Sequence, residues 1–117
     1  MLRSERDYIM RMIAAAAAAA ARLRERLVGG TAPDEIVRDA RAAQIELLGQ
    51  ESSLLRALDP TSAAHAIGDA DRITAWVELL RVETAALEAG GDSAAARGLE
   101  LRAAALEKLA RADKQKR

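Results

Sequence analysis

His65 is the residue whose type most readily suggests chemistry, because it is the only histidine in the chain. Asp59 and Asp69 lie near it in the sequence, and an imidazole beside carboxylates can act as a general base or a metal ligand. A transition-metal site needs further histidine or cysteine ligands, however, and the sequence contains no cysteine. We therefore expect His65 to be a surface or capping residue.

Pairs of nearby carboxylates are the other candidates for chemistry: Asp34 with Glu35, Asp69 with Asp71, and Glu83 with Glu88. Catalytic carboxylates need a pocket that shifts their pKa, whereas these acids mostly fall at expected helix starts or on polar helix faces. Asp69 and Asp71 are similar to the start of a calcium loop that lacks its glycine and terminal glutamate. The glycine pairs lack the lysine or third glycine of nucleotide-binding loops. We expect no catalytic, metal or cofactor site, and no enzyme.

Helix signals organise the first two thirds of the chain. A helix over residues 2–28 contains eight consecutive alanines, Ala14 to Ala21, and ends at Gly29-Gly30. A second helix is expected to start at Thr31, whose side chain can cap it, with Pro33 in its first turn. Residues 51–67 are expected to form a connector of short helices, the second over 61–67 after the Asp59-Pro60 start signal.

The remaining residues predict a helical hairpin. Its first helix runs from about Asp69 to Ala89, and its second from Ser93, capped by Asp92, to about Ala112. Trp76 lies on the apolar face of the first and is expected in the core. Because β-branched residues never alternate with polar ones as in a strand, we predict an all-α bundle of four to five helices. The single domain divides into segments 1–30, 31–68, 69–112 and a frayed tail, 113–117.

A heptad-spaced row of apolar residues lies along the first helix, at steps of four and three. We call this row the seam, and its members are Ile9, Ile13, Ala16, Ala20, Leu23 and Leu27. The seam is either the domain's own core contact or a self-association face, since its alanines would let two helices approach closely. Tyr8, beside it, either caps the core or lies at a dimer edge.

Two resemblances add to this interpretation. The hairpin with its Gly91-Asp92 turn and small Ala96 and Ala103 resembles a tetratricopeptide unit, although Glu83 and Thr84 replace the Leu and Gly of that motif. The opening residues 6–13, Arg-Asp-Tyr-Ile-Met-Arg-Met-Ile, are similar to the start of a family of small uncharacterised bacterial helical proteins. Leu47-Leu48-Gly49, Leu58-Asp59-Pro60 and Gly91-Asp92 match that family's later motifs. The resemblance implies the helical architecture and no activity.

Composition narrows the function. The formal net charge is zero, with 18 basic and 18 acidic residues, which disfavours a dedicated nucleic-acid or membrane-surface protein. The longest apolar run is far shorter than a membrane span, and the lack of cysteine suits a reducing cytoplasm. We therefore expect a cytoplasmic, non-enzymatic interaction or scaffold module that forms a homodimer through its first helix and engages a protein or peptide partner.

Two alternatives to this module remain open. One is a ligand-binding or enzymatic role in a cavity around Trp76, Tyr8 and His65. The other is weak binding of nucleic acid by the arginines of the first helix together with the basic C-terminal residues. These basic residues are Arg3, Arg6, Arg11, Arg22, Arg24, Arg26, Lys114, Lys116 and Arg117.

Overall fold

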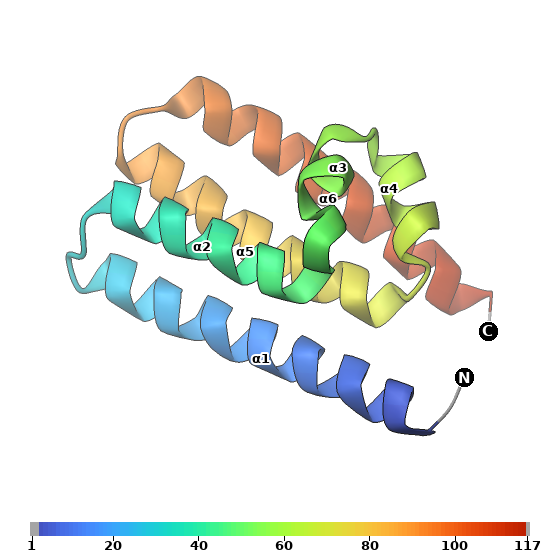
Figure 1. Cartoon of the computed structure of the whole chain (residues 1–117). Helices are drawn as coiled ribbons and strands as arrows, with labels where there is room; N and C mark the ends of the chain where they lie inside the picture. The colour runs from blue at the N-terminus through green and yellow to red at the C-terminus, as the bar shows by residue number, and fades with distance from the viewer. Residues whose placement is uncertain (1–2, 117) are drawn as a thin grey trace.

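The computed structural model describes residues 3–116 and consists of helices joined by short turns (Figure 1). The elements are α1 (Arg3–Val28), α2 (Pro33–Leu48), the 3₁₀ turn η1 (Gly49–Glu51), α3 (Ser52–Ala57), α4 (Pro60–Ile67), α5 (Ala70–Ala89) and α6 (Ser93–Gln115). The predicted all-α bundle is confirmed. Among residues 3–116, no helix is both long enough and apolar enough to cross a membrane.

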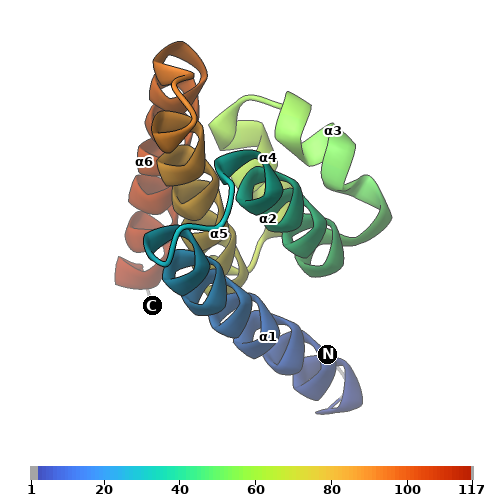
Figure 2. The ribbon, with the colours of Figure 1, turned by 90° about the vertical axis from the view of Figure 1, so that its left-hand side faces the viewer.

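Helix α5 is the centre of the bundle, because α1, α2 and α6 all pack against it. The four long helices alternate in direction, so that α5 and α6 form the antiparallel hairpin that the sequence predicts (Figure 1). The short helices α3 and α4 lie on one side, away from α1, and α4 packs against α6 (Figure 2). In α5 the buried side chains therefore face several directions, and Trp76, Leu79, Leu80 and Val82 are all fully buried.

An aspartate N-cap begins each of three helices, as predicted. Asp59 accepts a hydrogen bond from the backbone N–H of Ser62, Asp69 from those of Asp71 and Arg72, and Asp92 from that of Ala95. Each aspartate satisfies N–H groups that have no partner inside the helix. The aspartate positions therefore fix where α4, α5 and α6 begin.

The predicted start of the second helix is wrong by two residues. Helix α2 begins at Pro33, and its N-cap residue is Ala32, which has no side-chain hydrogen bond. Thr31 instead belongs to the preceding turn, where its backbone N–H donates to the carbonyl of Arg26 at 2.9 Å. Gly30, with φ of 100°, makes this turn possible because a side chain is strained in that conformation.

The predicted frayed tail is also wrong for most of its length. Helix α6 continues beyond Ala112 to Gln115, while Arg117 lies outside the described residues. Lys114 forms an ion pair with Asp71 of α5 at 2.8 Å, and Ala110 is buried one turn earlier. Contacts with the first turn of α5 therefore hold the last turn of α6 in place.

The alanine run of α1 has one buried side and one exposed side. Ala16 and Ala20 are buried together with Leu23, while Ala14, Ala17, Ala18 and Ala21 are exposed. Ile13 and Leu27 pack against the same core, and Ile9 is half-buried. Since α1 packs on α2 and α5, these burials support the interpretation of the seam as the domain's own core contact.

The seam residues named as interface candidates must be corrected for this reason. Ala16, Ala20 and Leu23 are covered by the chain itself and cannot meet a second copy without opening the fold. Tyr8 differs, because 57% of its surface is exposed at the end of α1. Any self-association through α1 must therefore use the opposite side of the helix.

The two sides of the alanine run can be tested by one pair of substitutions. We expect Ala20→Leu to lower the free energy of unfolding by about 1–3 kcal/mol, because Ala20 has no exposed surface and the larger side chain overpacks the core. Ala18→Leu, on the exposed side, should change it by less than about 0.5 kcal/mol. Urea unfolding followed by circular dichroism measures both. Equal effects would contradict the described orientation of α1.

Candidate functional site

A buried carboxylate lies at the centre of the fold. Glu83 of α5 has no exposed surface, which corrects the expectation that it lies on a polar face, whereas Glu88 is exposed as predicted. Its Oε2 accepts hydrogen bonds from Arg41 Nε at 2.8 Å and from Arg56 Nη2 at 3.2 Å. Its Oε1 accepts from Gln44 Nε2 at 2.7 Å and from Arg56 Nη1 at 3.1 Å. Both oxygens are therefore engaged by donors from α2 and α3.

Gln44 extends this set of hydrogen bonds to the aromatic core. Its side-chain carbonyl accepts from the indole Nε1 of Trp76 at 3.1 Å and also from Arg56. Trp76 is fully buried, so its predicted place in the core is confirmed. A buried indole N–H needs an acceptor, and Gln44 supplies one while its amide nitrogen binds Glu83.

Arg102 of α6 contacts both Trp76 and the end of α3. Its guanidinium lies 5.3 Å from the centre of the Trp76 ring, within the range of a cation–π contact. The same group donates to the backbone carbonyl of Leu58 at 2.6 Å and to that of Leu55. These carbonyls lie at the end of α3, so Arg102 ties the connector to α6. We call Arg41, Gln44, Arg56, Trp76, Glu83 and Arg102 the Glu83 cluster.

The electrostatics of the Glu83 cluster favour an ionised carboxylate. Burial raises the pKa of Glu83, but hydrogen bonds from Arg56, Arg41 and Gln44 outweigh it, and the net pKa is below the ordinary value. Burial lowers the pKa of Arg102, and repulsion from Arg56 adds to this. With both oxygens engaged and a lowered pKa, Glu83 is poorly suited to accept a proton from a substrate. The arrangement is suited to hold helices together.

The three residues proposed to surround a cavity do not come together. Trp76 is fully buried, and His65 is exposed. Tyr8 lines a cavity of about 520 Å³ near Gly49 and Arg72, whereas His65 lines a different one of about 420 Å³ between α4 and α6. In residues 3–116 no group of three or more His, Asp or Glu side chains is arranged to hold a metal ion.

Several other charged residues have structural partners. Asp69 caps α5 and also pairs with Arg6 at 3.5 Å, while Asp71 pairs with Lys114. Arg26 of α1 pairs with Asp39 of α2 at 2.9 Å. Capping, which the sequence suggested, accounts for Asp69, and ion pairing, which it did not suggest, accounts for Asp71.

Sequence reasoning missed the Glu83 cluster, although the spacing contains a signal. Glu83 lies seven residues after Trp76, which places it on the same apolar face of α5. Gln44 lies four residues after Ala40 and three before Leu47, on the apolar stripe of α2. Two polar residues inside apolar stripes indicate a buried pair that needs partners. No local pattern identifies Arg56 or Arg102 as those partners.

Removing the charge of Glu83 should weaken the whole fold. We expect Glu83→Gln to lower the free energy of unfolding by about 3 kcal/mol, because Arg41 and Arg56 lose their counter-charge. Glu88→Gln, five residues later on the exposed face, should change it by less than about 0.5 kcal/mol. Urea unfolding followed by Trp76 fluorescence measures both. In a double-mutant cycle, Glu83→Gln and Arg56→Gln should be strongly non-additive, and simple additivity would contradict their coupling.

The lowered pKa of Glu83 predicts a dependence of stability on acid. Below the ordinary pKa of 4.5 the unfolded chain takes up a proton before the folded one, so the stabilisation present at neutral pH is lost as the pH falls further. We expect the stability of Glu83→Gln to fall less steeply below about pH 4.5 than that of the original chain. Part of the slope remains, because hydrogen bonds also lower the pKa values of Asp39, Asp59 and Glu107. Identical slopes in denaturant titrations across this pH range would contradict the role given to Glu83.

Comparisons with family models, with curated protein sequences and with solved structures found no match. The likeness of the hairpin to a tetratricopeptide unit and the resemblance to a bacterial helical family therefore stay predictions.

Proposed function

We propose that the chain is a non-enzymatic interaction module that pairs with a second copy of itself through α1. The observation that supports this most directly is a stripe on the exposed side of α1. This outer stripe consists of Arg11, Ala14, Ala18, Ala21 and Glu25, all exposed and spaced by three or four residues. Its alanines would let a second helix approach closely, because methyl groups occupy little space between two backbones.

The two charged ends of the outer stripe favour one direction of pairing. Arg11 and Glu25 have no ion-pair partner among residues 3–116. Each lies seven residues from Ala18, so an antiparallel pair centred on Ala18 sets Arg11 of one copy beside Glu25 of the other, twice by symmetry. A parallel pair would set like charges opposite each other. The stripe therefore favours an antiparallel homodimer.

The expected dimer is weak. A buried methyl group contributes only about 0.8 kcal/mol, and the outer stripe has alanines at its centre in place of large anchors. We expect a dissociation constant on the order of micromolar or higher. Such a pairing suits a scaffold whose assembly depends on its concentration.

Nucleic-acid binding by α1 has less support. Arg6 and Arg26 pair with acidic residues of the same chain, and Glu25 lies among the remaining arginines. Within residues 3–116 no continuous basic stripe is left on α1, and Trp76 is buried, so it cannot stack against a base. These observations favour the protein interface.

A charge exchange tests the interface without touching the core. We expect Arg11→Glu or Glu25→Arg alone to weaken the dimer, because each sets like charges opposite each other. The double variant with both changes should restore the dimer, because opposite charges again lie beside each other at both ends of the outer stripe. Sedimentation velocity over a wide range of concentrations, at low and high salt, measures the association.

The control variant is Ala18→Glu, which places charges at the centre of the pair and should leave only monomer. Circular dichroism should show that all four variants remain folded, since the substituted residues are exposed. A monomeric original chain up to millimolar concentration would refute the proposal. Failure of the double variant to recover dimer would refute the antiparallel register.

A further inference from the structure

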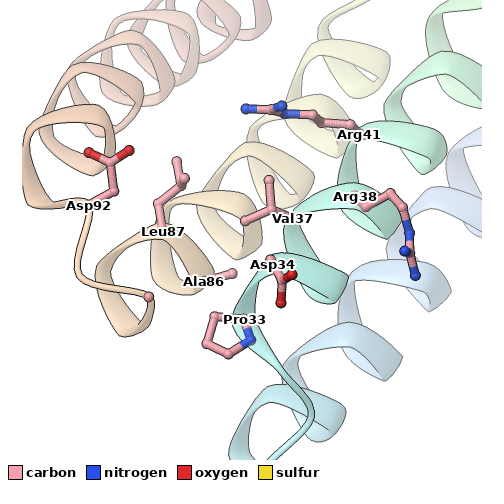
Figure 3. Close-up of a pocket in the computed structure, with 9 residues that line it drawn as sticks. Pro33, Asp34, Val37, Arg38, Arg41, Ala86, Leu87 and Asp92 are labelled. Atoms are coloured by element: carbon pink, nitrogen blue, oxygen red, sulfur yellow. The ribbon is translucent and has the colours of Figure 1, made fainter.

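Within residues 3–116, helices α2 and α6 do not close over α5 by packing directly on each other. Both of these helices pack on α5. The side chains of Arg56 and Arg102 bridge one part of the space between α2 and α6, where Arg56 reaches Gln44 and Glu83 while Arg102 binds the end of α3. The part nearer the turn between α5 and α6 is open and forms a cavity of about 490 Å³ (Figure 3).

The floor of this open cavity is apolar. Val37 of α2 and Leu87 of α5 are half-buried and face each other across it, and Ala86 and Pro33 continue the surface (Figure 3). The volume lies in the range of about 300–1,000 Å³ that small-molecule sites occupy. A small ligand fits this space better than an extended segment of protein.

One rim of the cavity carries a cation that is only partly neutralised. Arg41 extends over the apolar floor, and 54% of its side chain is exposed (Figure 3). Only its Nε is bonded, to Glu83, so its two terminal nitrogens have no acceptor in the part of the chain that the structure describes. Glu83 also neutralises Arg56, so two guanidinium groups share one carboxylate. The rim therefore has positive charge and free donors for an anion.

The two acidic residues of the lining do not remove this preference. Asp92 is engaged at the start of α6, where its side chain accepts from the backbone N–H of Ala95 at 3.2 Å. Asp34 lies in the first turn of α2, where the helix N-terminus stabilises its charge. Both are exposed and lie beside the opening, and Asp34 is on the side of Pro33, away from Arg41 (Figure 3). An elongated ligand can place its anionic end at Arg41.

We propose that this cavity binds a small amphiphilic carboxylate. Its acid group accepts hydrogen bonds from the terminal nitrogens of Arg41, and its apolar body packs on Val37, Ala86 and Leu87. A guanidinium and a carboxylate form charge-assisted hydrogen bonds, which are stronger than those between neutral groups. The site is separate from the outer stripe of α1, so binding does not depend on dimer formation.

Octanoate and octanol are the probes that separate recognition of the carboxylate by Arg41 from packing of the apolar body on the cavity floor. Trp76 is the only tryptophan, and Gln44 and Glu83 link it to Arg41, so its fluorescence should report binding. We expect saturable binding of octanoate, with octanol at least about tenfold weaker, because it lacks the charged acceptor. Isothermal calorimetry gives the stoichiometry, expected to be one octanoate per chain.

Variants locate the site. Arg41→Gln should weaken octanoate binding at least about tenfold. Arg38→Gln is the matched control: Arg38 also lines the cavity, but its guanidinium points away from the apolar floor in Figure 3 and pairs with Glu35 and Asp39, so this variant should leave affinity unchanged. Val37→Phe should weaken octanoate binding by taking up part of the space over the apolar floor, and it keeps Arg41. A folding defect in one variant therefore does not decide the result.

Three outcomes would overturn the proposal. They are no saturable binding of octanoate, equal affinity for octanol, or unchanged affinity in both Arg41→Gln and Val37→Phe with circular dichroism intact. The monomeric Ala18→Glu variant should bind octanoate as the original chain does. Loss of binding in that variant would place the ligand at the dimer interface instead.

Discussion

Burial of a single negative charge constrains the rest of this fold. An ionised carboxylate in a protein interior is costly unless every lone pair has a donor, and Glu83 obtains its donors from Arg41, Gln44 and Arg56. These residues come from α2 and α3, so both elements must hold fixed positions relative to α5. Arg102 then links α3 to α6 through the end of the connector. Packing of apolar side chains alone would not specify this arrangement so narrowly.

Helix α1 is held by a different interaction. It contributes nothing to the Glu83 cluster. It packs on α2 and α5 with the buried methyl groups of Ala16 and Ala20 and with Leu23, Ile13 and Leu27, and Arg26 adds an ion pair with Asp39 of α2. Small side chains allow close approach but bury little apolar surface, so each contact contributes little free energy. The helix therefore combines high intrinsic propensity with modest tertiary attachment. Its exposed side remains free for a second molecule.

Local sequence signals predicted most of the helices. The features that they did not predict depend on contacts between residues distant in the sequence. Asp59, Asp69 and Asp92 mark helix starts by their own hydrogen bonds, so no distant residue is needed to find them. The alanine run in the middle of α1 could not show which side of the helix faces the core, because alanine occupies every face there. The burial of Glu83 depends on arginines distant in the sequence, which no periodic pattern identifies. The open cavity depends on how α2 packs beside the end of α5, which sequence spacing does not determine.

The late place of α5 in the sequence has a consequence for biosynthesis. On the ribosome, α1 and α2 emerge before the helix that covers both of them. During that interval the side chains of Ile36, Leu47 and Leu23 cannot yet be buried in the complete core. A nascent chain in this state exposes apolar surface that promotes aggregation. An alanine-rich leading helix limits that exposure, because methyl groups attract other chains weakly. The composition of α1 thus suits a chain in which the central helix, α5, is translated after the two helices that pack on it.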